Sequence, residues 1–131
     1  MARYDKYEPK GGGFRAPLAA AHVLADINIA FGVGLNSSGQ VVRGNGNTGV
    51  IGVLVLNQVM VAGAVVDVMT SGEIVEATAS DGTTALTAGT AYFADPTTGF
   101  IEATATGDTK LGFTVEATRL IVRLGDLVVP A

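Results

Sequence analysis

Closely spaced turn signals are the feature that most constrains this fold. From residue 50 onward, short apolar runs alternate with "TSG", "SDGTT", "DPTTG" and "TGDT". In "ADPTTGF" a mechanism is visible: Asp95 opens a turn, Pro96 presets φ, and Gly99 supplies a permissive backbone. Strands separated by turns every 8–12 residues are typical of a sandwich or barrel. The pattern therefore predicts an all-β fold, a small β-barrel or β-sandwich.

The predicted strands fall in the second two thirds of the chain, and no segment shows a sustained helical stripe. They lie near residues 50–57, 59–69, 73–78, 90–94, 100–105, 111–117 and 119–124. Before them, "NSSG" at 36–39 is predicted to be a turn between two short strands. Residues 21–31 remain ambiguous, because "DINIAF" alternates like a strand while "LAAAHVLA" favours one or two helical turns.

The first residues are predicted to form an extended N-terminal arm, 1–22, on a β body, 23–131. Pro9, Pro17 and the Gly11–Gly13 run oppose a helix or a central strand. The arm nevertheless carries Tyr4, Tyr7 and Phe14, three of eight aromatic residues in the chain. Aromatic side chains on a basic, extended segment are typical of anchors that become ordered on binding.

Charge is scarce and unevenly distributed. Charged residues are 15% of the 131, against about 25% in typical domains. Residues 1–20 carry a net charge of +2 and residues 21–131 a net charge of −6, so the arm suits an acidic neighbour. A solvated tail is the alternative. The overall charge of −4 argues against nucleic acid as a partner.

Candidate catalytic and metal sites are weak. The chain has no Cys and one His, His22, so no thiolate or multi-histidine site is available. "GNGNTG" at 44–49 matches G-x-G-x-x-G, but the β-branched run after it favours a hairpin loop over a nucleotide site. Asp81, Asp95 and Asp108 fall in predicted turns, where Asp serves the backbone. We expect no enzyme activity, no cofactor and no bound metal.

Two further segments bear on partners. The stretch 50–69 is apolar, but Asn57, Gln58 and Asp67 interrupt it, so buried strands are favoured over a membrane span. The first twenty residues lack the apolar core of a secretory signal. In "TRLIVRL", Arg119 and Arg123 are four apart and share one strand face, which is either an exposed charged face or an interface.

Residues 50–124 resemble the small capsid decoration (head cement or stabilisation) proteins of tailed bacteriophages. The resemblance lies in the order of "GVLVLNQVMVAGAVVDVMTSGEIVEA", "TALTAGTAYFADPTTGFIEATATGDTKLGFTVEA" and "RLIVRL". The matching residues are Gly63, Val66, Val68, Gly72, Ile74, Ala88, Gly89, Tyr92, Asp95, Gly99, Thr106, Gly107, Asp108, Leu111, Gly112 and Arg123. The longer, basic, Tyr-bearing arm departs from the family pattern.

The resemblance implies a structural protein made in the host cytoplasm and placed on the outer capsid surface of the virion. Such proteins commonly form homotrimers that clamp the major capsid protein without covalent bonds, and the family has no catalytic residues. We expect partner contact at Tyr4, Tyr7, Phe14 and Arg15, and contact between copies at Arg119 and Arg123. The alternatives are another virion component, such as a minor coat, tail-tube or connector subunit, and a surface carbohydrate-binding module.

Overall fold

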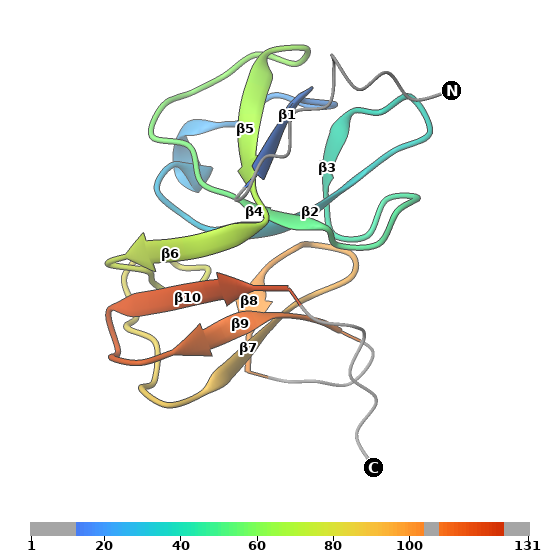
Figure 1. Ribbon diagram of the computed structural model, residues 1–131. Helices are drawn as coiled ribbons and strands as arrows, with labels where there is room; N and C mark the ends of the chain where they lie inside the picture. Colours follow the sequence, from blue (N-terminus) through green and yellow to red (C-terminus); the bar gives the residue numbers. More distant parts are fainter. Residues whose placement is uncertain (1–12, 104–107, 125–131) are drawn as a thin grey trace, which may run out of the picture.

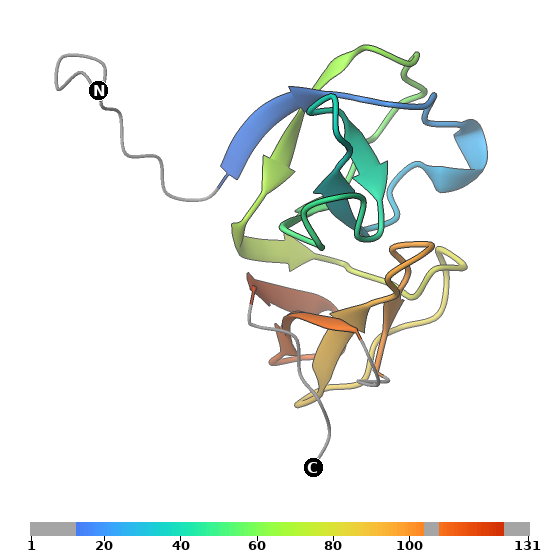
Figure 2. The same ribbon diagram turned by 90° about the vertical axis from the view of Figure 1, so that its right-hand side faces the viewer.

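The computed structural model describes residues 13–103 and 108–124, and these form two five-stranded antiparallel sheets. The first sheet has the order β1-β5-β4-β2-β3 and the second the order β6-β10-β9-β7-β8. Figure 1 shows the first sheet stacked above the second, and Figure 2 shows the same two layers after a quarter turn. Neither sheet closes into a barrel within the described residues, so the predicted all-β fold is confirmed as a β-sandwich.

The chain completes one sheet before it begins the other. The first sheet contains β1 (Gly13–Pro17), β2 (Phe31–Leu35), β3 (Val41–Arg43), β4 (Gly52–Leu54) and β5 (Val65–Met69). The second contains β6 (Ser71–Val75), β7 (Ala91–Ala94), β8 (Ile101–Glu102), β9 (Thr109–Thr114) and β10 (Arg119–Arg123). A single residue, Thr70, joins β5 to β6 and carries the chain from one layer to the other.

Several sequence predictions are corrected in detail. The strand predicted over 59–69 forms only at Val65–Met69, because Gly63 has a φ of 89° and donates its backbone N–H to the Leu18 carbonyl in a turn. The ambiguous segment 21–31 becomes a three-residue 3-10 turn, Leu24–Asp26, followed by β2 at Phe31. The turn predicted at 36–39 does join two short strands, β2 and β3.

The last part of the predicted arm is built into the first sheet. Gly13–Pro17 pair with β5 as an edge strand, with Phe14 opposite Val68 and Ala16 opposite Val66. An edge position tolerates Pro17, which lacks a backbone donor. Leu18 is buried, and its N–H donates to the Ala64 carbonyl. Residues 1–12, with Tyr4 and Tyr7, lie outside the described residues.

Alternation on β2 and β4 creates two cores on opposite faces of the first sheet. Phe31, Val33 and Leu54 point into a core that the first sheet makes with its own strands and loops. Ala30 and Val53 point the other way, into the core shared with the second sheet. There they meet fully buried residues of the second sheet such as Leu111 and Leu120.

The two sheets approach closely at Gly32, where any side chain would collide with the Ala94 methyl group. The Asp95–Gly99 turn holds this approach. The Gly32 N–H donates to the Gly99 carbonyl at 2.7 Å, and the Asn45 N–H donates to the Pro96 carbonyl at 2.9 Å. Within the turn, the Asp95 carboxylate accepts the N–H groups of Thr97 and Thr98, as the sequence predicts.

We predict that Gly32→Ala lowers the free energy of unfolding by about 1–3 kcal/mol, the usual cost of overpacking a core. Ala94→Gly removes the methyl group that the new side chain would meet. The double variant should therefore recover most of the loss, as urea denaturation would show. Equal destabilisation of the single and double variants would show that the close approach lies elsewhere.

Candidate interaction site

Phe14 and Arg15, two of the predicted partner-binding residues, lie on opposite faces of β1. Phe14 is half-buried and packs against the core of the first sheet. Arg15 is exposed, and its Nε lies 3.0 Å from a carboxylate oxygen of Asp67, the residue opposite it on β5. Because both side chains are well exposed, this ion pair contributes little stability and is accessible to a partner.

Both residues line a groove of about 760 Å³ between the two sheets. The second sheet covers β2 and β4 of the first sheet but leaves the side of β5 and β1 that carries Asp67 and Arg15 open. Val53, Val55 and Met69 form an apolar floor, and β6 supplies one wall. The complete lining is Gly13, Phe14, Arg15, Val53, Val55, Asp67, Val68, Met69, Glu73 and Ile74. The groove is larger than the hollow of about 410 Å³ beside His22 and Phe31, and Gly13 at the start of β1 lines it.

Arg119 and Arg123 lie on the outer face of β10, as their spacing predicts. Arg119 is already bound within its own chain: its guanidinium lies 2.7 Å from Glu116 and 3.5 Å from Glu73. Its Nε is buried and has no hydrogen-bond partner in the part of the chain that the structure describes. Arg123 is exposed at the end of the strand, opposite Ser71 of β6.

Apolar side chains surround these arginines on the outer face of the second sheet. Phe113 lies opposite Ile121 on one side and Ala91 on the other, and Val75 lies opposite Arg119. Val75 is 66% exposed and Phe113 is 37% exposed. We call Val75, Phe113, Val115, Arg119 and Ile121 the outer face. The sequence predicts only its arginines, although the alternation in "LGFTV" places Phe113 and Val115 on one side of a strand.

A second exposed apolar patch lies at one end of the first sheet. The segments around His22 and Met60 are joined by two backbone hydrogen bonds of 2.8 and 3.1 Å. Beside them, four large aliphatic side chains are at least half exposed: Val23, Leu24, Val59 and Val61. No residue from 44 to 66 is charged, so the segment that carries Val59 and Val61 adds no charge beside this patch. Patches of this kind often mark interaction sites.

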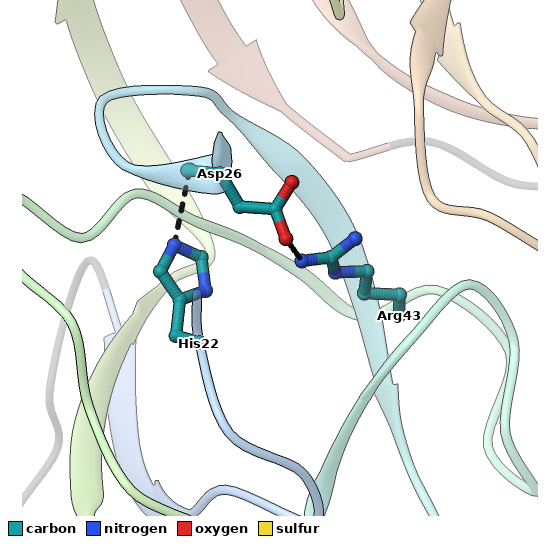
Figure 3. A network of polar contacts seen from close by, with 3 residues as sticks. All are labelled: His22, Asp26 and Arg43. Atoms are coloured by element: carbon teal, nitrogen blue, oxygen red, sulfur yellow. Dashed lines mark hydrogen bonds and ion pairs between the residues drawn. The ribbon is translucent and has the colours of Figure 1, made fainter. Parts of the chain in front are cut away.

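His22 is a structural residue (Figure 3). It is buried, its Nε2 lies 3.0 Å from the Asp26 carbonyl oxygen, and its ring meets Phe31 edge-on. The Asp26 carboxylate pairs with Arg43, whose guanidinium lies 4.0 Å above the centre of the Phe31 ring. These contacts join the 3-10 turn to β3 and to the core.

Two of the three turn aspartates, Asp81 and Asp95, serve the backbone as predicted, whereas the turn predicted at Asp108 falls partly outside the described residues. Hydrogen bonds from Thr84, and then from Thr83, lower the pKa of Asp81 to about 2. The N–H groups of Thr98 and Thr97 likewise lower the pKa of Asp95. The "GNGNTG" segment forms the loop between β3 and β4, and its amides at Gly44, Asn45 and Asn47 donate to carbonyl groups of the fold.

Two other carboxyl groups have raised pKa values instead. Burial, and then the charge of Asp95, raises the pKa of Asp108. Burial, followed by the charges of Asp108 and Asp95, raises the pKa of Glu102. Among the described residues, no group of three or more His, Asp or Glu side chains has the arrangement of a metal site. Nor is any helix in 13–103 or 108–124 long and apolar enough to span a membrane.

Comparison with known proteins identifies the fold. A solved chain from Mycobacterium phage Patience superposes with a TM-score of 0.80 at 20% sequence identity. The match covers 95% of this chain and 96% of the phage chain, so the two share the whole two-sheet architecture. No model of a known protein family matches this sequence, and no curated protein matches it.

The shifted carboxyl groups predict a pH dependence of stability. Glu102 and Asp108 have raised pKa values in the folded state. The stability that their protonated forms contribute is therefore present below the unfolded pKa values, 4.5 and 3.8, and is lost as pH rises through the folded pKa values. Asp81 and Asp95 act oppositely: their contribution is present above 3.8 and is lost as pH falls through the folded values. We therefore expect Asp108→Asn to raise the melting temperature at pH 7 by a few degrees and to change it little at pH 3.5.

Thermal unfolding followed by circular dichroism at the two pH values checks this expectation. Glu76→Gln is the matched control, because Glu76 is an exposed carboxylate directly after β6. If the Asp108→Asn and wild-type curves differed by the same amount at both pH values, buried charge at Asp108 would not be the cause.

Proposed function

We propose that this chain is a structural protein of a bacteriophage virion that binds the outer surface of the capsid. It stabilises the coat lattice by clamping neighbouring subunits of the major capsid protein through non-covalent contacts. The observation that carries the proposal is the whole-length fold match to a chain from Mycobacterium phage Patience. The sequence resemblance of residues 50–124 to capsid decoration proteins supports the capsid surface as the place of action.

The surface chemistry supports a binding role. A binding interface needs apolar surface, and the polar groups within it need hydrogen-bond partners once they are buried. This molecule offers three such areas: the groove beside β1, the outer face, and the apolar patch at Val23 and Val61. Its aspartates at 81 and 95 are committed to turns, and His22 is packed in the core. We therefore propose a role without catalysis, cofactor, nucleic acid or membrane.

The coat contact is proposed at the arm and at β1. Tyr4 and Tyr7 provide aromatic anchors, and Arg15 provides an exposed guanidinium whose partner, Asp67, is itself exposed. Phe14 fixes the start of the body through its packing on the first core. An arm tethered to an anchored body gains affinity because its local concentration is high.

Contact between copies is proposed at the outer face, in a homotrimer. The acidic groups Glu73 and Glu116 already neutralise Arg119, which lowers the cost of removing its charge from water. Exposed Phe113 and Val75 supply the apolar area around Arg119.

Light scattering tests the proposed trimer. We expect a mass of about 40 kDa, three times the 13.2 kDa of the chain. Phe113→Asp should reduce the mass to that of a monomer, because it buries a charge in the contact. Val23→Asp, at an apolar site that is 50% exposed against 37% for Phe113 and lies away from the outer face, should leave the trimer intact. A trimer that survives Phe113→Asp would exclude the outer face, and a monomeric wild type would exclude the free trimer.

Particle binding tests the capsid role. Virions of the phage that encodes the chain should contain it in their heads, and heads stripped of it should rebind the purified protein on co-sedimentation. Deletion of residues 1–12, which leaves β1 intact, should weaken rebinding at least tenfold while circular dichroism is unchanged. Ser37→Ala, in the exposed turn between β2 and β3, is the control. Recovery of the chain in tail fractions, or its absence from particles, would contradict the proposal.

A further inference from the structure

The outer edge of β6 has no strand beside it within residues 13–103 and 108–124. β6 pairs with β10 on one side only, so it ends the second sheet. The other sheet edges are shorter or blunted: β3 has three residues, β8 has two, and β1 ends in a proline. β6 is five residues long and contains Ile74 and Val75. A free edge of this length is a template for another strand.

This free edge forms a wall of the groove beside β1. Glu73 and Ile74 of β6 line the groove together with the uncovered floor of the first sheet, Val53, Val55 and Met69. The second sheet therefore stops about one strand short of covering the first. A strand added beside β6 would form hydrogen bonds with the free backbone groups at the edge of β6. The side chains of the added strand would also cover the apolar floor of the groove.

We propose that, in the free protein, this strand is the N-terminal segment of the same chain, from within residues 1–12. Gly13 itself lines the groove, so the segment before it starts at the site. Twelve extended residues reach about 40 Å, whereas a five-residue strand spans about 17 Å, so the segment is long enough to follow β6. The Gly11–Gly13 run lets the chain change direction as it enters.

The side chains of the segment match the groove. Asp67 and Glu73 place two carboxylates along it, the first paired with Arg15 and the second 3.5 Å from Arg119. Both carboxylates are still about half exposed or more, so further cations can approach them. The segment carries Arg3, Lys6 and Lys10. Tyr4 and Tyr7 offer aromatic rings for the apolar floor, with hydroxyl groups that remain near solvent. Charge and apolarity therefore both favour this occupant.

Tethering favours the same chain over a second copy. A segment joined to its site by a short linker has an effective concentration in the millimolar range, well above the micromolar concentration of other copies in a dilute solution. Docking would also protect β6 from pairing edge to edge with another molecule before assembly. This inference concerns the free protein and does not rest on the proposed capsid role.

The absence of cysteine from the chain permits a direct test. Seven double variants combine Glu73→Cys with one cysteine at each position from Tyr4 to Lys10, and mild oxidation is followed on non-reducing gels. Disulfides need Cα atoms about 4.4–6.8 Å apart and side chains on the same face, so a docked strand should give a fast intramolecular bond at the one position opposite residue 73. We expect the rate at that position to be at least tenfold above the rates at its neighbours. Ser37→Cys in place of Glu73→Cys is the control, because Ser37 lies at the opposite edge of the first sheet.

Each outcome of this scan decides the proposal. A single fast position flanked by slow neighbours, together with slow reaction of the Ser37→Cys controls, supports it. Uniform rates along the segment would overturn it, because they indicate no fixed register. Disulfide-linked dimers would also overturn it and would assign the groove to the arm of a second copy.

Hydrogen exchange provides a second readout that needs no cysteine. Deletion of residues 1–12 should accelerate exchange of the β6 amides that face away from β10, and it should leave the amides between β9 and β10 unchanged. Equal exchange of the β6 amides in both proteins would contradict docking at this edge.

Discussion

The close contact between Gly32 of the first sheet and Ala94 of the second sets the spacing on which the rest of the structure depends. Sheets packed face to face usually lie about 10 Å apart, and a glycine opposite an alanine permits a closer local approach. The turn from Asp95 to Gly99 secures that approach, because its carbonyl groups accept hydrogen bonds from Gly32 and Asn45. A segment that contains no reactive chemistry thus joins the two layers. Its role is to position surfaces.

The same contact decides which surfaces remain open. Because the second sheet packs over β2 and β4, the side of β5 and β1 that carries Asp67 and Arg15 lies beyond its edge. The groove beside Arg15 is therefore a consequence of how the sheets are offset. The outer face, by contrast, is the solvent side of the second sheet, where Phe113 and Val75 have no covering layer among the described residues. One packing arrangement produces both candidate interfaces.

Charge is used sparingly and mostly within the molecule. Arg43 is held by Asp26 over the Phe31 ring, and Arg119 is held by Glu73 and Glu116. Pairing of this kind contributes little to stability at a surface. It does, however, leave broad apolar areas that a partner can cover without burying an unpaired charge. That property suits the proposed role as a structural protein.

The sequence by itself determined the fold class, most of the turns and the shared face of Arg119 and Arg123. These features follow from local rules: the side-chain period of two in a strand and the backbone preferences of Asp, Pro and Gly. The sequence also predicts partner contact at Phe14 and Arg15, from aromatic and basic residues in an arm, and the structure places both beside the groove. It did not reveal that Gly13–Pro17 join the first sheet, because the pairing partner, β5, lies some fifty residues away in the chain.

Only the tertiary structure decided which strands are neighbours, where one sheet stops covering the other, and which apolar side chains remain exposed. Val75 and Val66 are both valines in strands, yet one is 66% exposed and the other 3% exposed. Nothing in their local sequence separates them, since strand alternation gives two faces but not the layer that each face meets. Burial is a property of the assembled layers, and so the groove, the outer face and the free edge of β6 could be found only in the folded molecule.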